Sequence, residues 1–210
     1  MLNEFFLEKF EKIKPEAEKF YNQRKEITND FNFDATPSTY RVFRSTKQKP
    51  SIVFKTWAFN TIGNIGLFAV IGANEFFIDI LSINDKKSFN EFHKKYSNAL
   101  SDFWIKEQKE ALELTYKYKL FDLFLKSLTI CNFNNENINK QLLKYCNIPL
   151  DSITLNGLDK ITDGKLNLAG KSMGFVKTEE TYNELQNIVL DICKRTNNYP
   201  LYFDFFSKII

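Results

Sequence analysis

The chain contains a single histidine, His93, among its 210 residues. Histidine is the side chain best suited to proton transfer near neutral pH, and most hydrolytic triads and most zinc or non-haem iron sites recruit it. A chain with one imidazole has little room for those chemistries. The sequence therefore predicts no metal site and no cofactor, and it favours a non-catalytic protein over an enzyme. An enzyme whose site is assembled from scattered Asp, Tyr and Lys without a linear motif stays open as an alternative.

Cysteine and arginine are also scarce. Cys131, Cys146 and Cys193 are odd in number and form no C-x-x-C pair, so the sequence shows neither a disulfide framework nor a cysteine zinc site. Buried free thiols in a reducing cytoplasm are the simplest interpretation. The basic residues are 25 lysines and only four arginines, which disfavours bidentate phosphate clamps and direct base recognition.

Long hydrophobic runs are absent as well. No apolar run reaches the roughly 18 residues that a membrane-spanning helix needs. Residues 1–6 are acidic and apolar, whereas a signal peptide begins basic and then becomes apolar. We therefore expect a soluble, cytoplasmic protein without a membrane partner.

What the chain does contain is enough apolar material for a core. Hydrophobic residues make up 43% of it, 22 of them phenylalanine, and the net charge is only +3. This length and composition predict one folded domain over residues 1–210. The joint bias towards Phe, Asn, Lys and Ile is typical of an AT-rich coding sequence, as in many bacteria and phages.

The spacing of apolar residues changes along the chain. Residues 3–29 carry an apolar stripe at helical spacing, in which Pro15 predicts a break or kink near Lys14. The following residues hold four runs rich in β-branched and aromatic side chains, separated by short turns. Short turns join antiparallel neighbours, so these runs predict a four-stranded antiparallel β-meander over about 39–83. The four runs are 39–45, 51–59, 65–71 and 76–83.

The remainder, residues 86–210, is predicted to be mainly helical, which makes the fold class α+β. Residues 120–128 are apolar on nearly every helical face and should be the most buried helical segment. The glycine-containing stretch 150–177 is predicted to be a loop or a small β excursion, and the aromatic tail 199–210 should dock on the body. The helices are expected over 88–100, 102–129, 134–146 and 178–195.

Several groups of residues resemble catalytic or ligand-binding motifs but do not have the spacing that those motifs require. Gly170-Lys171-Ser172 lacks the glycine five positions before Gly170 that a phosphate-binding loop requires. Helix–strand–strand–strand–helix order resembles, in outline only, the core of restriction-type nucleases, which need an acid-x-lysine pair on a strand. Here Asp79 is followed by Leu81, so an active nuclease is not expected.

His93 and a nearby group of carboxylates have structural explanations. His93 shares an apolar helical face with Phe89, Tyr96 and Leu100, which favours a packed core histidine over a catalyst. The carboxylates alternate with lysines on roughly one helix face, as on a solvated, charge-balanced surface. They are Glu107, Glu110 and Glu113.

The best positive signal is a basic, aromatic segment over residues 31–60. If the first two predicted strands form a hairpin, Arg41 lies near Lys55 on one face, and like charges in that position need a neutralising group. That group is either an internal carboxylate such as Asp79, an acidic partner protein, or a nucleic-acid backbone. The candidate partner-binding residues are Arg41, Arg44, Lys47, Lys49, Lys55 and Trp57.

Together these observations predict a non-catalytic cytoplasmic module that binds a protein partner. A toxin-neutralising immunity protein or an inhibitor of a bacterial defence system has this size and this lack of catalytic groups, an argument from class analogy. The alternative is a nucleic-acid-associated protein that binds through the basic aromatic hairpin.

Overall fold

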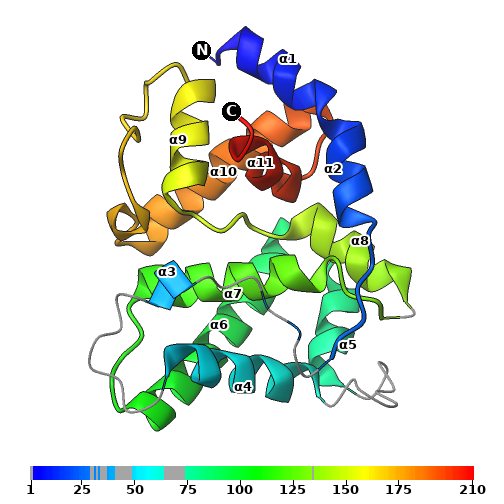
Figure 1. Ribbon diagram of the computed structural model, residues 1–210, viewed down its shortest axis with the longest axis vertical. Helices are drawn as coiled ribbons and strands as arrows, with labels where there is room; N and C mark the ends of the chain where they lie inside the picture. Colours follow the sequence, from blue (N-terminus) through cyan, green and yellow to red (C-terminus); the bar gives the residue numbers. More distant parts are fainter. Residues whose placement is uncertain are drawn as a thin grey trace. The chain divides into compact units, whose positions relative to one another are not determined.

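A computed structural model describes residues 2–28, 31, 33, 37–40, 49–63, 74–133 and 135–210. By their contacts they divide into two compact units, unit 1 (1–23 and 146–210) and unit 2 (24–145). The regular elements of these residues are helices (Figure 1), apart from an isolated parallel bridge between Lys25 and Cys131. The described part of the chain is thus an all-α fold. None of its helices combines the length and apolar character needed to cross a membrane.

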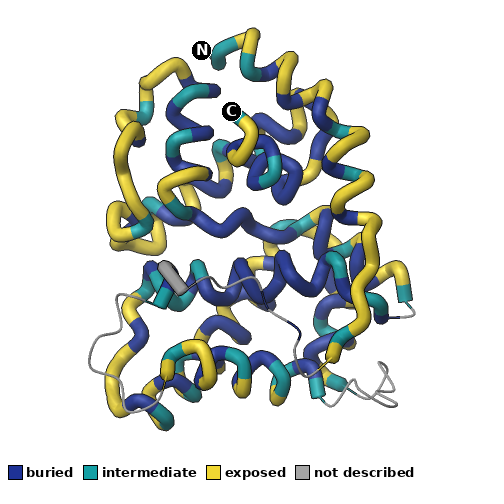
Figure 2. The backbone as a smooth tube through the Cα atoms, in the orientation of Figure 1, coloured by how far each residue is buried: buried dark blue, intermediate teal, exposed yellow. Residues whose placement is uncertain are grey.

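Unit 1 combines helices from two distant parts of the sequence. α11 packs against α2, α9 and α10, and it is almost entirely buried (Figure 2). The predicted docking of the tail 199–210 is therefore confirmed. The helices of this unit are α1 (Glu4–Lys12), α2 (Lys14–Tyr21), α9 (Ser152–Ile161), α10 (Glu179–Thr196) and α11 (Pro200–Ser207), with a 3-10 turn at Met173–Phe175.

The predicted break near Lys14 is confirmed, because α1 ends at Lys12 and α2 begins with Pro15 in its first turn. The prediction that helical structure reaches residue 29 is wrong, since α2 ends at Tyr21. After α2 the backbone of Lys25 forms hydrogen bonds with the segment that follows α7. The Lys25 N–H donates to the Ile130 carbonyl at 2.7 Å, and the Lys25 carbonyl accepts from the Asn132 N–H at 2.9 Å.

The stretch 150–177 contains α9, so its expected loop or β character is wrong over that helix. Gly157 lies inside α9, where a Cβ would come within 2.9 Å of the Ser207 Cβ. This glycine permits close approach of α9 and α11 and forms no hairpin turn. Asp163 and Gly164 do turn the chain after α9, because both have positive φ, at 58° and 73°.

Unit 2 is organised around α7, whose residues 120–128 are all buried. The predicted burial of this segment is confirmed. α7 packs on α6 and α8, and α4 and α5 both contact α6. The helices are α3 (Pro37–Tyr40), α4 (Pro50–Ile62), α5 (Glu75–Ser82), α6 (Lys86–Gln108), α7 (Leu114–Leu128) and α8 (Glu136–Tyr145).

The predicted β-meander, and with it the α+β fold class, is wrong. Run 51–59 lies in α4 and most of run 76–83 in α5, while 39–40 belongs to α3. Residues 41–45 and the run 65–71 fall outside the described residues. The β preference of branched and aromatic residues is a weak, context-dependent term, and burial on a helical period overrides it here. The buried residues of α4 show that period: Val53, Phe54, Trp57, Ala58 and Ile62.

The expected helices 88–100 and 102–129 have different boundaries in the structure. α6 runs without a break from Lys86 to Gln108, and its capping box is formed by Asp85 and Ser88. Its continuity through residue 101 follows from burial, since Leu100 and Trp104 are both fully buried at helical spacing. The chain breaks later, after Lys109 with φ 60°. The helices predicted at 134–146 and 178–195 correspond to α8 and α10.

Candidate protein-binding face

The structure describes three of the six predicted partner-binding residues. Lys49 precedes the first turn of α4, and Lys55 and Trp57 lie within that helix. Arg41, Arg44 and Lys47 fall outside the described residues. Because Lys55 is helical, the strand pairing that was expected to bring Arg41 beside it is wrong.

α4 forms where the chain supplies a start signal, an apolar inner face and a stop signal. Pro50 stands in the first turn, where its missing N–H has no intrahelical acceptor to lose. Gly63 ends the helix with φ 70°, a conformation that glycine adopts at little cost. The buried inner face holds α4 on the core of unit 2 and fixes which side chains point outward.

Trp57 belongs to this inner face. Its side chain is 4% exposed, and its ring centroid lies 5.1 Å from that of Phe124 and 6.1 Å from that of Phe121. Both pairs are edge-to-face, the arrangement that aromatic quadrupoles favour. Trp57 therefore anchors α4 on α7, and the outward surface is made by its neighbours.

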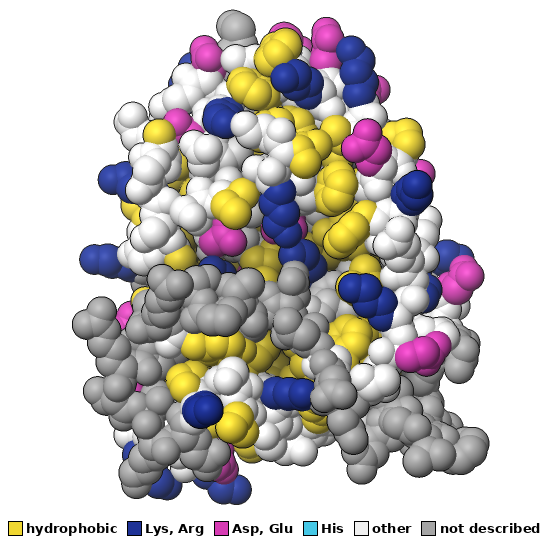
Figure 3. Space-filling view, in the orientation of Figure 1, with side chains coloured by type: hydrophobic (Ala, Val, Ile, Leu, Met, Phe, Trp, Pro, Cys, Tyr) yellow, Lys and Arg dark blue, Asp and Glu magenta, His cyan; other side chains and the backbone are white. Residues whose placement is uncertain are grey.

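The outer face of α4 combines apolar and basic side chains. Ile52 is 52% exposed, and Lys55 and Phe59 are partly exposed at the following helical positions. The Lys55 amine lies 5.6 Å from the centroid of the Phe59 ring, a cation–π contact. Figure 3 shows basic and hydrophobic side chains side by side over α4. We call Lys49, Ile52, Lys55, Thr56 and Phe59 the α4 face.

The charge on the α4 face is of one sign. Residues 49–63 contain two lysines and no aspartate or glutamate. Phe59 is held from below by Phe33, with ring centroids 5.2 Å apart. Sequence reasoning found the two lysines from charge alone but missed Ile52. The spacing of Lys55 and Phe59, three and seven residues after Ile52, is the signal that identifies the face.

His93 lies in the core, as the sequence predicts. Its Nε2 is 2.9 Å from Oδ1 of Asp122, which joins α6 to α7, and the two side chains are 5% and 0% exposed. The rings of Phe121 and Tyr118 pack against the imidazole at centroid distances of 4.9 and 5.1 Å. The pair is closed to any substrate of ordinary size and acts as a buried polar tie between two helices.

Asp79 is part of an ion-pair cluster between α5 and α6. The Lys95 amine donates to Asp79 at 2.7 Å and to Glu75 at 2.6 Å, and the Tyr96 hydroxyl donates to Asp79 at 2.9 Å. Hydrogen bonding to Asp79 raises the pKa of Lys95. Burial, followed by the hydrogen bond to Asp79, raises the pKa of Tyr96. Asp79 is thus engaged within unit 2 and does not neutralise the α4 face through any contact of the described residues.

The remaining candidate groups do not converge. Glu107 lies in α6, Glu110 in the break between the helices and Glu113 at the position before α7, so the expected shared helix face is wrong. Lys171 and Ser172 precede only the 3-10 turn. Within the described residues, no three His, Cys, Asp or Glu side chains are grouped so as to hold a metal ion.

Comparison of the chain with protein-family models, with curated proteins and with solved structures finds no significant match. The geometry and charge of the α4 face are therefore the features that indicate a function.

Proposed function

We propose that this protein is a non-catalytic protein-binding module whose α4 face docks on an acidic partner surface. The observation that supports the proposal is the stripe formed by the exposed Ile52 and the partly exposed Lys55 and Phe59 on a helix that carries no carboxylate. A toxin-neutralising immunity protein or an inhibitor of a bacterial defence system is the kind of protein that works in this way.

The α4 face has the elements of a helix-in-groove interface. Such interfaces take apolar anchors from one stripe of a helix, at spacings of three, four and seven residues. Ile52 and Phe59 supply the anchors, and Phe59 is already oriented by Phe33, which lowers the entropy lost on binding. Lys49 precedes the anchors and Lys55 lies between them. Both lysines attract carboxylates on the partner, which favours encounter and correct orientation.

The test compares two double variants with equal changes in net charge. Lys49→Glu with Lys55→Glu reverses the charge of the α4 face. Lys94→Glu with Lys106→Glu is the matched control, since both lysines are exposed on α6. Each tagged protein is used to capture partners from a lysate of the native host, and retained proteins are identified by mass spectrometry.

The proposal expects a partner retained by the wild type and by the α6 control and lost with the α4 variant. With that partner purified, the α4 variant should associate at least about tenfold more slowly, with a flatter salt dependence. Equal association of the α4 variant and the control would refute the assignment of the face.

Nucleic acid is the competing occupant, and filter binding separates it from a protein. Retention of generic duplex or single strands by the wild type, falling steeply as salt rises and lost in the α4 variant, would contradict the protein-partner proposal. Absence of retention at both low and physiological salt supports it.

A further inference from the structure

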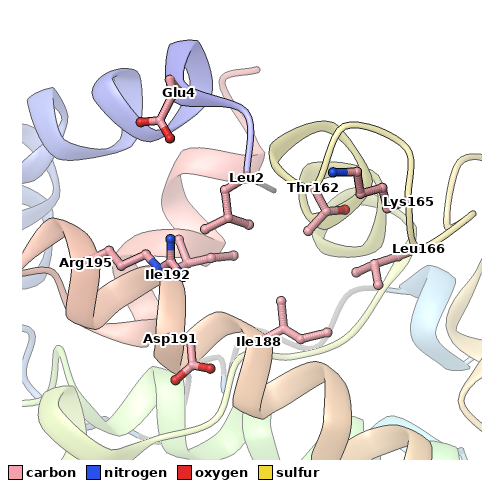
Figure 4. A pocket seen from close by; sticks show the side chains of 9 residues that line it. All are labelled: Leu2, Glu4, Thr162, Lys165, Leu166, Ile188, Asp191, Ile192 and Arg195. Carbon is pink, nitrogen blue, oxygen red and sulfur yellow. The ribbon is translucent and has the colours of Figure 1, made fainter.

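Unit 1 contains a pocket of about 370 Å³ between the start of α1, the turn that follows α9, and α10 (Figure 4). This volume lies near the lower end of the range of roughly 300–1,000 Å³ found for small-molecule sites. All residues that line the pocket belong to unit 1, whereas the α4 face belongs to unit 2. The pocket is therefore separate from the surface of the proposed protein-binding function.

The walls of the pocket are fixed by hydrogen bonds within unit 1. The Asn3 N–H donates to the Ile161 carbonyl at 2.8 Å, which holds the start of α1 against the end of α9. The Leu168 N–H donates to the Asp159 carboxylate at 2.8 Å, which ties the turn back to α9. The segments that line the pocket are thus positioned before any ligand binds, and this lowers the cost of binding.

The third wall is one face of α10. The other lining residues of this helix follow Ile188 by three, four and seven positions, which places them on the same face. They are Asp191, Ile192 and Arg195. α10 therefore gives the pocket both apolar surface and charge.

The apolar part of the lining comes from all three segments. Leu2 precedes α1, Leu166 lies in the turn after α9, and Ile188 and Ile192 belong to α10. Figure 4 shows the side chains of Leu2, Leu166 and Ile188 directed toward the space between these segments. Such a surface fits an aliphatic or aromatic group better than a sugar or an inorganic ion.

The charged part of the lining is balanced, with two cations and two carboxylates. One of each sign is already engaged, because Asp191 is paired with Lys194 at 3.5 Å and Lys165 interacts with another group. Glu4 and Arg195 remain, and neither side chain has a hydrogen-bond or ion-pair partner among the described residues. The pocket thus offers one uncommitted negative and one uncommitted positive group.

The positions of Glu4 and Arg195 favour their charged forms and their joint use. Glu4 lies in the first turn of α1 and Arg195 in the last turn of α10, and each has the sign that the helix dipole stabilises there. α1 packs on α10. Figure 4 shows Glu4 and Arg195 on one side of the space and Leu166 on the other. A ligand that uses both charges therefore has its two ionic groups together and an apolar group pointing away from them.

We propose that this pocket binds a free α-amino acid with an apolar side chain. Its carboxylate lies on Arg195, whose planar guanidinium matches a carboxylate in two parallel hydrogen bonds. Its ammonium group lies on Glu4, and its side chain contacts the leucines and isoleucines of the walls. A simple organic acid leaves Glu4 beside a like charge, and a simple amine does the same to Arg195, so the zwitterion is the ligand that matches both groups.

The test measures binding of L-leucine to the full chain by isothermal titration calorimetry and by the ligand-induced shift in Tm. Two probes keep the same apolar group and remove one charge each: 4-methylpentanoate lacks the ammonium, and 3-methylbutylamine lacks the carboxylate. We expect saturable binding of L-leucine, at least about fivefold tighter than binding of either probe. No saturation at about 10 mM L-leucine, or a probe that binds as tightly as L-leucine, would overturn the proposal.

Variants of the two charged groups locate the site through a change in specificity. Glu4→Gln should weaken L-leucine binding at least about fivefold without weakening 4-methylpentanoate, because it removes the partner of the ammonium and a charge that repels the acid. Arg195→Gln should weaken L-leucine binding to a similar extent without weakening 3-methylbutylamine.

Glu8→Gln on α1 and Lys194→Gln on α10 are the matched controls. Both side chains are largely exposed, and neither lines the pocket. They should leave L-leucine affinity within about twofold. The Tm of each variant without ligand reports whether its fold is retained. Unchanged L-leucine affinity in Glu4→Gln or in Arg195→Gln would show that the amino acid is not held by this pair and would refute the assignment.

Discussion

Replacing Phe124 with alanine should strongly destabilise unit 2. Phe124 is fully buried in α7. Its ring centroid lies 5.1 Å from that of Trp57, 5.4 Å from Phe33, 5.6 Å from Phe76 and 6.2 Å from Phe121. Emptying a packed phenylalanine site costs about 3 to 5 kcal/mol, and aromatic pairs contribute about 0.5 to 1.5 kcal/mol beyond area burial. Four ring neighbours from different parts of the unit place the expected loss near the upper end, at about 5 kcal/mol.

The chain provides a local probe for this measurement. Its only tryptophans, Trp57 and Trp104, are both buried in unit 2, so tryptophan fluorescence during urea titration reports on that unit. Far-UV circular dichroism reports on the helices of both units. Ile105→Ala in α6 is the control within the same unit, because Ile105 is 44% exposed and the change should cost under about 1 kcal/mol. A loss of under about 1 kcal/mol for Phe124→Ala, with an unchanged m-value, would refute the close packing described for α7.

Three further predictions concern other parts of the molecule. Gly157→Ala should destabilise unit 1 by about 1 to 3 kcal/mol through overlap with Ser207, whereas Gly174→Ala, whose nearest outside atom would be 3.8 Å away, should change the denaturation midpoint little. Burial raises the pKa of the Cys131 thiol to about 12, so alkylation of this cysteine at pH 8, followed by mass spectrometry, should be slow in the native protein and fast in urea; rapid native modification would contradict its burial. The pKa of Tyr96 is higher in the folded protein than in the unfolded chain, where a tyrosine pKa is about 10. The neutral hydroxyl therefore contributes its full stabilisation below about pH 10, and this contribution is lost as pH rises through the folded-state pKa. The urea midpoint should fall above about pH 10 in the wild type and should fall less in Tyr96→Phe.

The fold could be predicted from the sequence only where the residue pattern favoured a helix and no competing pattern favoured a strand. Residues 120–128 are apolar on nearly every helical face, so their burial follows from the pattern whichever helices surround them. α4 presented two signals at once. Its β-branched and aromatic residues favour a strand over a window of eight or nine residues, but the buried positions follow a helical period that shows only over the full 13 residues from Pro50 to Ile62.

The candidate site was predictable in its charge and not in its geometry. Lys49 and Lys55 stand out because no acid accompanies them from 49 to 63. These lysines share a surface with Ile52 only because α4 is a helix. In the predicted strand, where successive side chains alternate between faces, Ile52 and Lys55 would lie on opposite faces. The pocket in unit 1 had no local signal, since Leu2, Leu166 and Arg195 come together only when distant parts of the chain fold.

The division of the chain into two units has a consequence for the order of synthesis. Unit 2 is one uninterrupted stretch of sequence, whereas unit 1 needs both the residues before it and those after it. During translation, unit 2 is synthesised before α10 and α11. Its helices can therefore pack together before the helices that contact α1 and α2 have been made. During that interval Phe10 and Tyr21 are uncovered, because the rings that pack on them, Phe203, Phe206 and Tyr202, are translated nearly two hundred residues later. The rings of Phe10 and Tyr21 therefore gain their aromatic partners from α11 only when that helix has been made.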